Sequence, residues 1–302
     1  MKPPGRRATG ASRWRLRRSA GCRGWLLAIT IVGITFAHGP EDDQIRLLTA
    51  QLERHPQDLT ARLRRGELLR DHPRPGDTNT VAMAREDFAY VLRASPHLLS
   101  AQLGMARLEL ASGEFTNALR RLDQALTGTN PIATVHLLRA EALVKCGRPA
   151  EAVTSYSEAL QRQKDPRAES FLARARAQLA ASPTNFSAVL AGLDAGLARL
   201  GPVPGLQLLA LDIALRARDY TNALARVDAL AAESDRQESW LSRRGDVLLA
   251  AGRIAEARTA WQKALQACRQ LPERLRATPA LRDLEADLAQ KLASNAPGPA
   301  AP

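Results

Sequence analysis

The sequence predicts an all-α fold, a right-handed α-solenoid of about six helix pairs with a capping helix at each end. Of its 302 residues 45% are apolar but only 4% are aromatic, a composition that favours helices over strands. No stretch alternates apolar and polar residues over the length that a sheet would need. The segment FTNALRRLDQAL, residues 115–126, returns almost unchanged as YTNALARVDAL, residues 220–230.

The returning segment belongs to a repeat of 34 residues. One small apolar residue marks each copy, and successive markers are 34 residues apart except for one step of 37. A fixed period of this length is typical of solenoids built from helix pairs. The six markers, called here the repeat-signature residues, are Ala84, Ala118, Ala152, Val189, Ala223 and Ala257.

Offsets from each marker predict two helices and the turn between them. Positions four, seven and eight after the marker are mostly apolar and lie on one helix face. Five residues before the marker, Gly113, Gly147 and Gly252 stand where the preceding helix should end, because a left-handed C-cap favours glycine. Twelve residues before it, small residues such as Ala140 and Gly245 would let the two helices approach closely.

This pattern resembles the tetratricopeptide repeat (TPR), a helix pair with a small residue at position 8, glycine near position 15 and alanine at positions 20 and 27. The copy that contains RRGDVLLAAGRIAEARTAWQKAL, residues 238–271, matches best. The fourth copy departs from the pattern, with Val189 and Gly196 where alanine is usual. The fifth copy departs as well, because Leu211 occupies its small position.

The resemblance covers residues 59–271 and implies six repeats between two flanking helices. Residues 38–58 and 272–294 carry apolar stripes that suit capping helices, because the apolar face of a terminal repeat has to be covered. The tail 295–302 is expected to be disordered. A loop rich in proline and glycine, residues 71–80, interrupts the first repeat. The expected repeats are 59–98, 99–132, 133–166, 167–203, 204–237 and 238–271.

The first 37 residues are predicted to direct export. They hold eight basic residues and no acid, so the net charge of +12 falls to +4 for the rest of the chain. The uncharged apolar run Trp25–Ala37 follows the basic stretch and precedes an acidic one, which is the order of a secretory signal. Cleavage is expected after Ala37, which would release the protein into the periplasm. Two other interpretations stay open, namely an uncleaved anchor in the inner membrane through residues 25–37 and a plain basic tail.

No arrangement of reactive residues predicts an enzyme. No two of the five histidines stand at the i, i+4 spacing of helical metal ligands, and the sequence contains no P-loop and no G-x-S-x-G motif. We therefore expect no catalytic residues, no metal and no cofactor. A hydrolytic site assembled from scattered residues stays as a less favoured alternative. The near balance of charge after residue 37 argues against a nucleic-acid partner.

In the TPR family the first helix of each pair lines a concave groove that holds peptides or partner helices. The resemblance implies a non-catalytic protein–protein interaction scaffold whose partners are other proteins, or a membrane-tethered assembly factor of the same fold. Aliphatic residues at positions 5 and 12, among them Leu103, Val144 and Leu208, would line the groove. The alternative is that these positions are ordinary solvated or packing residues. The charged groove candidates are Glu67, Arg70, Arg107, Glu141, Lys145, Asp212, Arg216 and Asp246.

Overall fold

In the computed structural model all regular structure of the described residues is α-helical, and the predicted all-α solenoid is confirmed. The expected export segment with its cleavage site at Ala37 lies outside the described residues, as do most of the tail and residues 73–77 of the first-repeat loop. None of the described helices is long and apolar enough to cross a membrane. The described residues are 40–72, 78–127 and 132–295.

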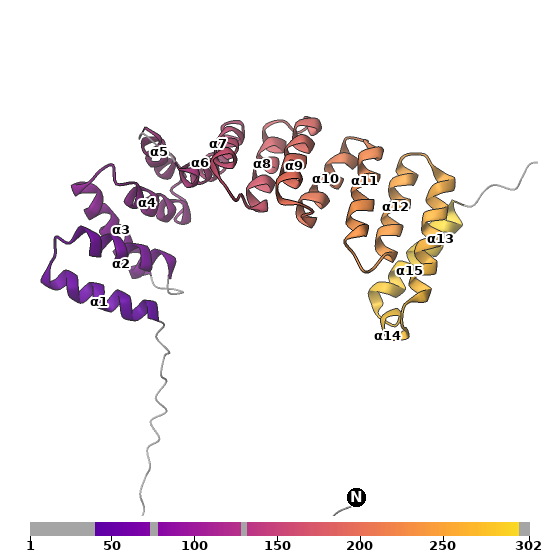
Figure 1. Cartoon of the computed structure of the whole chain (residues 1–302), viewed down its shortest axis with the longest axis horizontal. Helices are drawn as coiled ribbons and strands as arrows, with labels where there is room; N and C mark the ends of the chain where they lie inside the picture. Colours follow the sequence, from indigo (N-terminus) through magenta and orange to yellow (C-terminus); the bar gives the residue numbers. More distant parts are fainter. Residues whose placement is uncertain (1–39, 73–77, 128–131, 296–302) are drawn as a thin grey trace, which may run out of the picture. The chain divides into compact units, whose positions relative to one another are not determined.

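From α1 to α13 each helix packs against the next one along the chain (Figure 1). The helices from α2 to α13 form six pairs, in which the even-numbered member is called the first helix and the odd-numbered member the second helix. The helices are α1 (Pro40–Arg54), α2 (Leu59–Asp71), α3 (Thr78–Ala94), α4 (Leu99–Ala111), α5 (Phe115–Leu126), α6 (Ala133–Lys145), α7 (Pro149–Arg162), α8 (Ala168–Ala181), α9 (Phe186–Leu200), α10 (Pro204–Arg216), α11 (Tyr220–Ala232), α12 (Glu238–Ala250), α13 (Ile254–Gln270), α14 (Glu273–Arg276) and α15 (Pro279–Ser294).

The first helices form a layer of their own. Besides its sequence neighbours, α4 contacts both α2 and α6, and α8 contacts α10. A surface made of first helices is therefore continuous from one pair to the next in these places. This layer carries the candidate groove residues.

In the first and sixth pairs, a glycine of the first helix faces a large aromatic residue of the second helix. A Cβ added to Gly66 would lie 3.1 Å from the Phe88 ring, and one added to Gly245 would lie only 2.3 Å from Nε1 of Trp261. Phe88 and Trp261 are the two largest fully buried side chains among the described residues, and the two glycines make room for them. The repeat-signature residues Ala84, Ala118, Ala152, Val189, Ala223 and Ala257 are all completely buried as well.

In the second, third, fifth and sixth pairs the turn between the two helices contains a residue with positive φ. After α4 the Glu114 N–H donates to the carbonyl oxygen of Glu109 at 2.8 Å, across a glycine, as in a Schellman motif. In the fifth pair a non-glycine residue, Arg218, takes this place with φ 56°. The predicted glycine caps are confirmed, since positive φ values of 77°, 72° and 75° occur at Gly113, Gly147 and Gly252.

The helix α15 covers the last pair by packing against α13. Its Leu281 and Leu288 are buried in the same apolar cluster as Trp261 and Cys268. Arg258 of α13 fixes the end of α15, because its Nη1 donates to the carbonyl oxygen of Leu292 at 2.7 Å. This carbonyl group in the last turn of α15 has its hydrogen bond supplied by a side chain of the last helix pair.

Candidate interaction surface

All eight candidate groove residues lie on first helices, namely on α2, α4, α6, α10 and α12. Three large aliphatic side chains are exposed on the same set of helices. Val144 of α6, Leu208 of α10 and Leu249 of α12 are 42%, 49% and 36% exposed. We call these three residues together with the eight charged candidates the first-helix surface. Leu249 was not singled out from the sequence, although it stands at the same repeat position as Val144.

At the α2–α4 contact two basic candidates share one acid. Both Nε and Nη2 of Arg70 donate to the carboxylate of Asp71 at 2.8 Å. This hydrogen bond holds the pKa of Asp71 below its usual value, and the charges of Arg70 and Arg107 act in the same direction. Arg107 itself is exposed on α4. The Arg70 side chain is only 12% exposed, so Arg107 is the accessible basic candidate at this end of the surface.

On α6 the first-helix surface presents free charges beside an exposed valine. Glu141 and Lys145 are exposed, and neither side chain forms an ion pair or hydrogen bond with another described residue. Val144 is their close neighbour on the same helix. An unpaired charge next to exposed aliphatic surface can bind a partner without first breaking an internal bond.

On α10 the charges are partly engaged within the protein. Arg216 lies 4.0 Å from Asp212 on the next turn of the helix, and its guanidinium lies 5.3 Å from the centre of the Phe186 ring. Both members of the pair are well exposed, so the attraction between them is weak and solvent-screened. A partner that offers a better counter-charge can therefore displace either side chain.

Besides Arg70, three of the predicted groove residues are less available than the pattern implied. Asp246 accepts a bond from Lys291 of α15 at 2.7 Å and another from Nε1 of Trp261 at 3.1 Å. Glu67 is half-buried, 3.4 Å from Arg64 on its own helix. Leu103 is buried in the core, so the interpretation of this leucine as groove-lining was wrong.

The described residues give no indication of a metal centre. In residues 40–72, 78–127 and 132–295 no group of three or more His, Cys, Asp and Glu side chains is arranged to hold a metal ion. The first-helix surface instead combines exposed aliphatic groups with single charges.

Helix pairs packed in sequence, glycines that face large buried aromatic residues, and contacts between successive first helices define the class of helical-repeat proteins. Two family models then match the chain, one described as a tetratricopeptide repeat over residues 103–169 and one described as a tetratricopeptide repeat-like domain over residues 172–280. Together they match more than half of the sequence. The chain belongs to the tetratricopeptide repeat family.

Solved structures of TPR proteins share this fold. The C-terminal part of a TPR repeat-containing protein from Cytophaga hutchinsonii is 13% identical, with a TM-score of 0.56 over 77% of this chain and 87% of that one. YrrB, described as a TPR protein with an unusual peptide-binding site, is 14% identical, with a TM-score of 0.51 over 62% of this chain and 92% of that one. A structure of Naa15/Naa10 bound to HypK-THB is 13% identical, with a TM-score of 0.51 over 84% and 35%. At these identities the likeness concerns the fold alone. No curated protein matches the sequence.

Proposed function

We propose that this protein is a non-catalytic scaffold that binds a peptide or a partner helix on its first-helix surface. The TPR fold supports a protein–protein interaction scaffold, and the family is generally non-catalytic. The observation that carries the finer proposal is the row of exposed aliphatic side chains beside available charges. Val144 with Glu141 and Lys145, and Leu208 with Asp212, present both kinds of contact on one layer.

The chemistry of this surface favours an amphipathic partner segment. Aliphatic contacts would take its apolar face, and the single charges would fix its direction and register. The exposed guanidinium of Arg107 suits an acidic residue of the partner. Asp246 is held by Lys291 and contributes no free charge at the other end.

We also propose that the protein is exported from the cytoplasm. The support comes from the sequence of residues 1–37, in which a basic stretch precedes a 13-residue apolar run. Cleavage after Ala37 would free the protein in the periplasm, and an uncleaved run would tether it to the inner membrane. The mass of the N-terminal peptide of the protein recovered from cells distinguishes the two outcomes. Recovery in the cytoplasm with an intact N-terminus would contradict export.

Charge reversal on two first helices tests the groove. The double variant Arg107→Glu with Asp212→Lys should weaken binding of a captured partner by about 1–3 kcal/mol, because exposed interface charges affect encounter and release. The control variant Arg269→Glu with Asp283→Lys makes the same charge changes on α13 and α15, where both residues are exposed. It should bind like the wild type. Undiminished binding by a folded Arg107→Glu/Asp212→Lys variant would show that the partner uses another face.

A further inference from the structure

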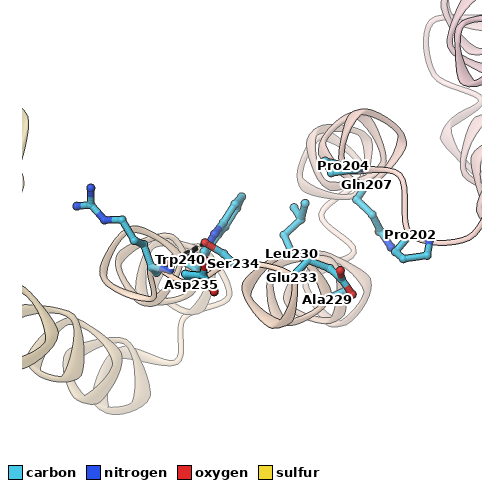
Figure 2. Close-up of a pocket in the computed structure, with 10 residues that line it drawn as sticks. Pro202, Pro204, Gln207, Ala229, Leu230, Glu233, Ser234, Asp235 and Trp240 are labelled. Atoms are coloured by element: carbon cyan, nitrogen blue, oxygen red, sulfur yellow. Dashed lines mark hydrogen bonds between the residues drawn. The ribbon is translucent and has the colours of Figure 1, made fainter.

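A cavity of about 430 Å³ opens where α10, α11 and α12 meet (Figure 2). It is walled by the start of α10, the end of α11 and the loop that leads into α12. Its volume lies within the range of about 300–1,000 Å³ that is usual for ligand sites. None of the eight charged groove candidates lines it, so it is a separate site. The residues that matter for its chemistry are Pro202, Pro204, Leu230, Glu233, Asp235 and Trp240.

One part of the cavity wall is apolar. Trp240 is half-buried on α12 and Leu230 is almost fully buried on α11, and Figure 2 shows their side chains projecting from these neighbouring helices. Pro202 and Pro204 line the side formed by the start of α10. An aliphatic chain that enters between these groups exchanges water for apolar contacts. The indole face also attracts a cation placed over it.

The rim of the cavity is acidic and is not neutralised. Glu233 and Asp235 are exposed lining residues, and neither side chain forms an ion pair or hydrogen bond with another described residue. Arg236 also lines the cavity, but it does not offset these charges, because its Nε donates to the carboxylate of Glu238 at 2.5 Å. Glu238 is buried and needs that partner. Two negative charges therefore remain at the mouth.

The loop that carries the rim is held in shape by its own hydrogen bonds. Nε2 of Gln237 donates to the carbonyl oxygens of Ala231 and Ser234, both at 2.8 Å. The Ser234 hydroxyl donates to the carbonyl oxygen of Arg236 at 3.0 Å. A rim that is already ordered loses little conformational entropy when a ligand binds.

We propose that this cavity binds an arginine side chain of a partner protein. The aliphatic stem would lie against Leu230 and Trp240, and the guanidinium would reach Glu233 and Asp235. Arginine fits better than lysine because its planar fork pairs with carboxylates through two hydrogen bonds and stacks on aromatic rings. The choice of a protein as partner rests on the proposed function. The cavity would give the partner a second point of contact, separate from the charged groove candidates.

The test uses the full chain with ¹⁵N-labelled tryptophan, whose indole N–H signals are followed by NMR. The signal of Trp240 is assigned with the variant Trp240→Phe. The probe is the capped peptide acetyl-Gly-Arg-Gly-amide, and the control peptide carries citrulline, which has the same shape without the charge. We expect a saturable shift of the Trp240 signal with the arginine peptide and affinity at least about tenfold lower for the citrulline peptide.

Matched variants locate the charge that matters. Glu233→Gln with Asp235→Asn keeps the shape of the rim, and should lower the affinity for the arginine peptide by about tenfold or more. The control variant Glu86→Gln with Asp283→Asn removes two exposed acids of α3 and α15 and should bind as the wild type does. All four exchanged residues are exposed, so the variants should fold, and far-UV circular dichroism checks that they do.

Three results would overturn the proposal. These are equal affinity for the two peptides, undiminished affinity of the rim variant, and the lack of a saturable Trp240 shift up to about 10 mM peptide. Tighter binding of free arginine than of the peptide would overturn the assignment to a protein partner. The groove variant Arg107→Glu/Asp212→Lys should bind the arginine peptide normally. Failure of the groove proposal and failure of the cavity proposal therefore give different results.

Discussion

Arg139 of α6 donates its Nε–H to the carboxylate of Asp123 on α5, 2.6 Å away, and so joins the third helix pair to the second. Arg244 of α12 makes the same bond to Asp228 of α11 at 3.0 Å, and in both cases the partners are 16 residues apart. The repeat thus reproduces an ion pair between adjacent pairs as well as an apolar core. It is a contact between neighbours, the kind that stabilises a solenoid.

The depth of an ion pair should decide its effect on stability. Asp123 is 47% exposed, so Asp123→Ala should lower the free energy of unfolding by less than about 1 kcal/mol. Asp87 is fully buried and accepts two bonds from Arg65 at 2.7 and 2.8 Å. Asp87→Ala would leave that arginine uncompensated and should cost about 3–5 kcal/mol. Urea unfolding followed by far-UV circular dichroism compares the two variants, and similar losses would contradict this ranking.

The space beside Gly245 should admit no methyl group. In Gly245→Ala the new Cβ would clash with the Trp261 ring, at a cost of about 1–3 kcal/mol in the free energy of unfolding. Adding Trp261→Leu should recover part of this loss, because leucine stands at the equivalent position of the second pair, Leu122. The control Gly205→Ala meets nothing closer than 3.8 Å and should leave stability nearly unchanged. A tolerated Gly245→Ala would show that α12 and α13 lie farther apart than described.

His136 should make the protein less stable in mild acid. Burial holds its pKa below the usual value, the charges of Arg162 and Arg139 act in the same direction, and Glu158 opposes them. The unfolded chain therefore binds this proton at higher pH than the folded chain does. The contribution is complete above about pH 6.5 and is lost as the pH falls from there towards the folded pKa.

Substitution of this histidine checks the assignment. His136→Leu also removes Nε2, which has no hydrogen-bond partner among the described residues, and should flatten the dependence of the urea midpoint on pH between about 5 and 7. The control His97→Leu changes an exposed histidine after α3 and should keep the wild-type slope. An unaltered slope in His136→Leu would assign the dependence to other groups.

The two cysteines of the repeats should differ in reactivity. Cys268 is fully buried, and burial, with the charges of Glu285 and Glu238, raises the pKa of its thiol. Cys146 is only half-buried. Iodoacetamide should therefore alkylate Cys146 at least about tenfold faster near neutral pH, as measured by mass spectrometry of the tryptic peptides. In urea the two rates should converge, and a reactive Cys268 in the folded protein would contradict its burial against α15.

The fold class could be predicted from the period of the sequence, because each repeat packs its two helices together with similar residues at the same positions. Glycine caps such as Gly113 and small core positions such as Gly245 recur at fixed offsets, and their physical roles can be deduced from the sequence. The bond between Lys291 and Asp246 follows no such period, since α15 is not part of the repeat. The cavity beside Trp240 likewise depends on the ends of three helices and on one loop. Such features arise where the repetition stops or is interrupted, so a repeat pattern does not predict them.

The helix α15 closes the C-terminal end of the row of helix pairs by packing against α13. Every pair in a solenoid offers its neighbour an apolar face, and an uncovered last pair would offer that face to another molecule. Leu281 and Leu288 occupy the face on α13, and Arg258 fastens the far end of the helix. Because α15 covers the apolar face of the last pair, a second copy of the protein cannot bind that face. The helix therefore prevents head-to-tail assembly of copies into fibres at this end.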